Sequence, residues 1–109
     1  MRLPLILLLL FFGLSIARAG QEMFIERAAW SVPKTAQVVL AMPVLQAVMH
    51  RLQDSAKARL TVYFPGGDEG SLWAIELRGW LVSLGLEASR IKLISGSQYP
   101  DRLQLQIEE

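Results

Sequence analysis

The sequence contains no cysteine and only one histidine, and both features limit the chemistry that the chain can carry out. Without cysteine it has no disulfides, no thiolate metal ligands and no cysteine for a lipid anchor. His50 stands alone, and no carboxylates are spaced to form a zinc-type ligand set with it. We therefore expect neither a metal nor a cofactor. A small exported domain without disulfides has to be held by its hydrophobic core or by a partner.

The charge balance does not favour nucleic acid as a partner. The chain has 11 basic and 10 acidic residues, a formal net charge of +1. Arg2 and Arg18 lie within the first 19 residues, so the remainder has nine basic against ten acidic residues and a net charge of −1. No basic stripe with interleaved aromatic residues is present, and such a stripe is the usual footprint of nucleic-acid binding.

The one long hydrophobic run lies at the N-terminus. Arg2 precedes Leu3–Leu14, which is almost wholly apolar, and Ala17-Arg18-Ala19 follows. A positive start, an apolar stretch and a small-x-small triplet make up a secretory signal peptide, and the run is shorter than the roughly 20 residues that span a membrane. We predict cleavage after Ala19 and a periplasmic location for one domain, residues 20–109. The alternative is an uncleaved anchor, which would be the only contact with a membrane.

Hydrophobic periodicity predicts two helices in the mature domain. Residues 34–54 place their apolar side chains on one arc of a helical wheel, while Pro43 lies opposite and either kinks this helix or marks its true start. Ser71 is the expected N-cap of a second helix, Leu72–Leu84, with Gly85 as its terminator. The second helix is apolar over most of its circumference. Its two apolar strips hold Trp73, Leu77, Trp80, Leu81 and Leu84, and Ile75 and Val82.

Alternation of apolar and polar residues predicts the strands. It is clear in residues 59–64 and 103–107, while residues 91–94 form a shorter strand and residues 23–30 a weaker one. The outward positions of these strands are polar, which predicts helices on one face of the sheet only. A helix between strands 59–64 and 91–94 implies a parallel crossover, and the last two strands can form a hairpin. The expected fold is a two-layer α/β sandwich, (β)-α-β-α-β-β, with a small mixed sheet.

Residues 33–107 resemble the C-terminal domain of the OmpA/MotB family. A helix leads into a strand that ends in a glycine- and aspartate-containing loop, Phe64-Pro65-Gly66-Gly67-Asp68. The next helix closes with Trp80-Leu81-Val82-Ser83-Leu84-Gly85-Leu86, and Glu87-Ala88-Ser89-Arg90-Ile91 leads into the following strand. The resemblance implies that Asp68 corresponds to the aspartate with which the family grips the peptide stem of peptidoglycan.

The second ligand residue of that family has no counterpart in this sequence. The family places an arginine in an Asn-x-x-Leu-Ser-x-x-Arg helix start, and the second helix here is about two turns too short to hold that motif. Arg78 does not fall at the matching place, and Arg90 or Arg102 reaches the loop only if the sheet brings its strand end there. We therefore expect a divergent, shortened domain that binds peptidoglycan weakly or not at all.

Candidate site residues fall in two places. Asp68 and Glu69 precede the second helix, where carboxylates interact favourably with the helix dipole, and they are the expected ligand contacts. Adjacent carboxylates rarely converge on one bond, and neither Ser71 nor Ser95 has a base nearby in the sequence, so we expect no enzymatic activity. Trp73 and Trp80 share one face of the second helix and are expected in the core; if they are exposed, Trp73, Ile75 and Val82 are the expected partner contacts.

Together these features predict an exported, non-catalytic binding module. We expect it to be an accessory component of a cell-envelope or secretion assembly, with an envelope protein as its partner. The alternative is a peptidoglycan-binding domain that uses a rearranged site around Asp68. Fold resemblance does not decide between these two functions, because one fold serves many functions.

Overall fold

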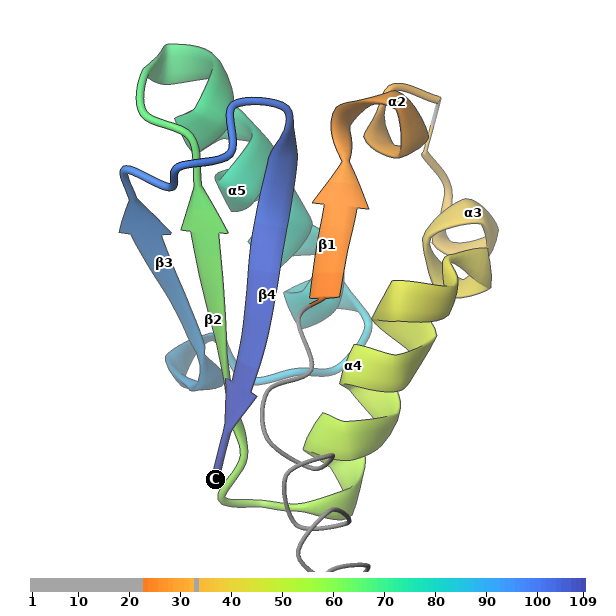
Figure 1. Cartoon of the computed structure of the whole chain (residues 1–109). Coiled ribbons are helices and arrows are strands. Elements are labelled where there is room, and N and C mark those ends of the chain that lie inside the picture. The colour runs from red at the N-terminus through yellow and green to blue at the C-terminus, as the bar shows by residue number, and fades with distance from the viewer. Residues whose placement is uncertain (1–22, 33) are drawn as a thin grey trace, which may run out of the picture.

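The computed structural model describes residues 23–32 and 34–109, so the expected signal peptide and its cleavage site lie outside the described residues. These residues form a four-stranded mixed sheet with helices on one face (Figure 1), which confirms the α/β sandwich and its element order. None of the helices described here is long and apolar enough to cross a membrane. The elements are β1 (Met23–Glu26), α2 (Arg27–Trp30), α3 (Ala36–Ala41), α4 (Pro43–Asp54), β2 (Arg59–Phe64), α5 (Asp68–Ser83), a 3-10 turn (Ala88–Arg90), β3 (Ile91–Ser95) and β4 (Arg102–Glu108).

The strands of the sheet follow the order β1-β4-β2-β3. β2 and β3 are parallel and connected through α5, as predicted, and β4 runs antiparallel to both β1 and β2. The hairpin expected between the last two strands is wrong, because β4 inserts between β1 and β2 instead of pairing with β3. The connecting loop crosses the end of β2, where the Ser97 amide donates a hydrogen bond to the Phe64 carbonyl at 3.0 Å.

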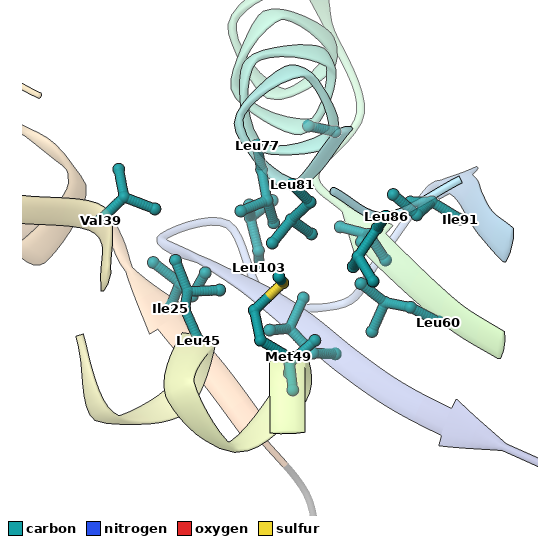
Figure 2. Packing of buried hydrophobic residues seen from close by; sticks show 14 of the residues in the cluster. Ile25, Val39, Leu45, Met49, Leu60, Leu77, Leu81, Leu86, Ile91 and Leu103 are labelled. Atoms are coloured by element: carbon teal, nitrogen blue, oxygen red, sulfur yellow. The ribbon is translucent and has the colours of Figure 1, made fainter. Parts of the chain in front are cut away.

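The core lies between the sheet and the helices (Figure 2). Alternate residues of each strand point into it, so that Leu60 and Val62 of β2 lie beside Leu105 of β4, all at most 1% exposed. The opposite face of the sheet carries the predicted polar positions Thr61, Lys92, Gln104 and Gln106. The largest fully buried side chains are Leu45, Leu52, Leu60, Leu77, Leu81, Leu103, Leu105, Val39, Val48 and Val62.

The region predicted as one helix, residues 34–54, forms two. α3 begins at the N-cap Thr35, whose hydroxyl accepts a hydrogen bond from the Val38 amide at 3.2 Å. The backbone becomes extended at Met42, and Pro43 then occupies the first turn of α4, where its missing N–H costs nothing. The break gives α3 its own orientation, so Val39 is buried in place of the expected Val38 and Ala41.

The chain segment after β1 is helical, although residues 23–30 suggested one strand. β1 ends at Glu26, and the short helix α2 turns the chain so that Trp30 enters the core at 6% exposure. This turn places the side chains of Arg27, Trp30 and Lys34 beside α5.

Helix α5 starts four residues earlier than predicted. Gly67 is its N-cap, with φ at 100°, and Asp68 is the first helical residue. Ser71 is therefore wrong as the N-cap, and its hydroxyl instead donates to the Gly67 carbonyl at 3.0 Å. Gly67 permits the early start because glycine adopts positive φ without steric cost. At the other end the prediction is confirmed: Gly85, with φ at 115°, terminates the helix, and the Leu86 amide donates back to the Leu81 carbonyl.

Candidate binding surface on helix α5

The two predicted ligand carboxylates, Asp68 and Glu69, occupy the exposed first turn of α5. Glu69 forms an ion pair with Arg27 of α2, and the two side chains are 75% and 46% exposed. Asp68 forms no ion pair within residues 23–32 and 34–109. An exposed pair of this kind contributes less than about 1 kcal/mol. Glu69 is thus already paired with the Arg27 guanidinium, while Asp68 is exposed to solvent.

Neither arginine considered for the loop reaches it. Arg90 donates to the carbonyls of Leu52, Ser55 and Ala58, at the end of the sheet where β2 begins. Arg102 hydrogen-bonds Asp101, which lowers the pKa of that carboxyl below its ordinary value. Its guanidinium also lies over the rings of two aromatic side chains, Phe24 and Tyr99. The guanidinium near the loop belongs to Arg27 instead.

The three predicted partner contacts have different surroundings. Trp73 is only 6% exposed and belongs to the core, which confirms the core position expected from its helix face, so it does not meet the condition of exposure for a partner contact. The Arg27 guanidinium lies 5.9 Å from the centroid of its ring. Ile75 and Val82 are 50% and 40% exposed, which leaves both available to a partner.

A stripe of exposed residues follows the outer face of α5. We define the outer stripe as Leu72, Ile75, Gly79 and Val82, which are spaced by three and four residues and therefore share one face of the helix. Leu72 is 67% exposed, the most exposed of the large apolar side chains in the described chain. Gly79 leaves an open place in the stripe, since a Cβ there would meet nothing within 4 Å. The large aliphatic side chains in this stripe thus stand beside a gap that a partner side chain can enter.

A groove adjoins the stripe, between the α2 segment and the first half of α5. Two ion pairs frame it: Arg27 with Glu69, and Lys34 with Glu76 at 3.2 Å. The two glutamates are two helical turns apart on α5, so the pairs stand one above the other along the helix. The groove has a volume of about 210 Å³ and is lined by Arg27, Trp30, Ser31, Lys34, Glu69, Leu72, Trp73 and Glu76.

Two tryptophans in the walls of this groove have unpaired indole N–H groups. The Nε1 atoms of Trp30 and Trp73 are buried, and neither finds an acceptor among the described residues. A buried donor without an acceptor costs about 1–3 kcal/mol. Lys34 Nζ lies 4.6 Å from the centroid of the Trp30 ring and donates to the Trp30 carbonyl at 2.6 Å. The cations of Arg27 and Lys34 thus lie over the rings of the two tryptophans in the groove walls.

The remaining candidate groups take no part in this surface. His50 pairs with Asp54 at 3.3 Å on the exposed side of α4, and Ser71 is held by the Gly67 carbonyl. Within residues 23–32 and 34–109, no group of three metal-ligating side chains is close enough to hold an ion. The outer stripe and the groove are therefore suited to apolar contact and hydrogen bonding.

No protein-family model matches this chain, and no curated protein matches it. The resemblance to the OmpA/MotB domain accordingly stays a prediction from the residues that suggested it.

Proposed function

We propose that this chain is an exported, non-catalytic binding module that works in the periplasm as an accessory component of a cell-envelope or secretion assembly. It binds a protein partner through the outer stripe and groove of α5. The observation that carries this proposal is the continuity of the two: Leu72 belongs to both, so exposed apolar side chains continue from Val82 to the edge of the groove. Single exposed apolar residues are common on protein surfaces and need no explanation. The apolar residues of the outer stripe, in contrast, lie together on one face of the helix.

The dimensions and chemistry of the surface favour a protein over a small molecule. Pockets for small ligands usually have about 300–1,000 Å³, and the groove, at about 210 Å³, accommodates a single side chain of a partner. Its apolar floor is ringed by the charged groups of Arg27, Lys34, Glu69 and Glu76, as protein interfaces have an apolar centre and a polar rim.

Site-specific photo-cross-linking in cells tests the proposal. A photoreactive residue at Ile75 or Val82 should give the same discrete cross-linked product with a second protein, because both positions face the partner. The matched control is Gln53, which is exposed on α4 and should give no such product. Equal products from positions 75 and 53, or none from either stripe position, would contradict the proposed surface.

One observation favours the alternative, a peptidoglycan-binding site around Asp68. Arg27 brings a guanidinium to the residue next to Asp68, and a guanidinium can bind a carboxylate with two hydrogen bonds. Arg27 is paired with Glu69, however, so a stem peptide would have to compete with an intramolecular carboxylate. This competition makes the alternative the weaker proposal.

Sedimentation with purified sacculi distinguishes the alternative from the main proposal. We expect weak or no co-sedimentation of the purified protein, and no difference between wild type and Asp68→Ala. Asp54→Ala serves as the control, because it removes an exposed carboxylate from the end of α4, which is not part of the loop before α5. Strong co-sedimentation that Asp68→Ala abolishes and Asp54→Ala leaves intact would establish peptidoglycan binding.

A further inference from the structure

The face of the sheet opposite the described helices contains a shallow depression at the end where β2 and β3 begin and β4 finishes. The C-terminus marked in Figure 1 lies at this end of the sheet. It has a volume of about 440 Å³. Three of its residues, Thr61, Tyr63 and Lys92, alternate with core positions and so point away from the helices. The depression is therefore separate from the outer stripe and the groove, which lie in the helical layer.

Positive charge predominates around this depression. Arg59, Arg90 and Lys92 line it, and Glu108 is the only carboxylate among its lining residues in the described part of the chain. The strand register explains the grouping, because Arg59 is paired with Glu108 across β2 and β4, and Thr61 with Lys92 across β2 and β3. Three cations against one anion favour a negatively charged ligand.

Arg90 is held rigidly at the edge of the depression. Its Nε donates to the Ala58 carbonyl at 3.0 Å, and its Nη2 lies 2.6–2.8 Å from the carbonyls of Leu52, Ser55 and Ala58. These hydrogen bonds connect the end of α4 to the start of β2, and the Nη1 atom takes part in none of them. A guanidinium that is already ordered loses little conformational entropy when it binds an anion.

The other lining residues supply a hydroxyl and an apolar wall. Thr61 is only 8% exposed, and its hydroxyl takes part in no side-chain hydrogen bond with the residues that the structure describes. Tyr63 and Ile94 are half-buried beside it. These groups suit a ligand in which the negative group is attached to carbon, because the cations contact the charge and the apolar wall contacts the framework.

We propose that this depression binds a small organic anion, with its negative group between Arg59, Arg90 and Lys92. The Thr61 hydroxyl donates a further hydrogen bond, and Tyr63 contacts the carbon framework. Carboxylate and phosphate groups share the chemistry that these residues recognise. This site is independent of the proposed partner surface, and either one can be wrong without affecting the other.

An amide-resolved NMR titration of the purified protein tests the site, with citrate and with glycerol 3-phosphate as probes at constant ionic strength. We expect chemical-shift changes confined to residues 59–63, 88–94 and 108, with a Kd on the order of 1 mM. Changes with citrate alone would assign the site to carboxylates, and changes with the phosphate ester alone to phosphoryl groups. No change with either probe, or changes spread over all basic residues, would overturn the proposal.

Three variants distinguish a specific site from general attraction between charges. Lys92→Gln should weaken binding about 5-fold, because it removes one charge-assisted contact. Lys57→Gln removes an exposed charge just before β2, outside the lining residues, and should leave the Kd unchanged. Thr61→Val keeps the side-chain shape and should also weaken binding. Equal effects of the Lys57 and Lys92 substitutions would contradict a specific site.

Discussion

Replacing Gly70 with alanine should destabilise the protein by about 3 kcal/mol or more, the range reached when a buried position is severely overpacked. Gly70 lies in the first turn of α5, buried against the end of β2. A Cβ at this position would lie 2.0 Å from the carbonyl oxygen of Pro65 and 2.9 Å from its carbonyl carbon. Both are backbone atoms, so no side chain can rotate away, and the helix start would have to shift from the strand end.

Gly79→Ala is the matched control for this prediction. Gly79 lies in the same helix, but a Cβ there would meet nothing within 4 Å. Alanine has the higher helix propensity, so this substitution should stabilise the protein by about 0.5–1 kcal/mol. Urea denaturation of both variants measures the two free energies of unfolding. Similar values for Gly70→Ala and Gly79→Ala would show that the contact between Pro65 and Gly70 is not as tight as described.

Leu45→Ala should reduce the free energy of unfolding by about 2–5 kcal/mol, the usual cost of removing a large aliphatic side chain from a core. Leu45 is 1% exposed and lies on α4 near Ile25 of β1 (Figure 2). The truncation leaves a cavity where the helix meets the sheet. The sequence already placed Leu45 on the apolar stripe of its helix, and the structure confirms its burial.

Leu40→Ala is the control for the core substitution, because the same truncation is made at a side chain that is 43% exposed. Its effect should be about 1 kcal/mol or less, since much of the side chain already contacts water. Thermal melts and urea curves of the two variants provide the comparison. A loss at position 40 that equals the loss at position 45 would contradict the assigned boundary of the core.

The parts of the fold that were predicted from the sequence depend on local pattern. Alternation in residues 59–64 identified β2 and its buried face, and the helical wheel of residues 34–54 identified the side chains that α4 buries. The position of β4 between β1 and β2 was missed because pairing between strands 40 residues or more apart leaves no local signal. The early start of α5 was missed because Gly66 and Gly67 are typical of loops, and the positive φ of Gly67 is a property of the folded chain.

The candidate surface was only partly predictable for the same reason. Ile75 and Val82 form a recognisable strip on the helical wheel, and both are exposed. Trp73 lies on the apolar face that predicted a core position, and it is buried. The short helix α2 beside it was missed because one turn of helix leaves no periodic signal. Arg27 was missed because its partner Glu69 is 42 residues away. The one local signal in that segment was a tryptophan, Trp30, among basic and small residues.

The most direct test of the proposed function is the affinity of a doubly substituted protein for the partner captured by cross-linking at position 75. Ile75→Glu together with Val82→Lys replaces two exposed apolar side chains, retains good helix formers and leaves the net charge unchanged. We expect the melting temperature to remain within a few degrees of wild type and the Kd for the partner to rise about 100-fold or more, as when central apolar contacts of an interface are lost. An unchanged Kd with an intact fold would contradict the claim that α5 carries the binding surface.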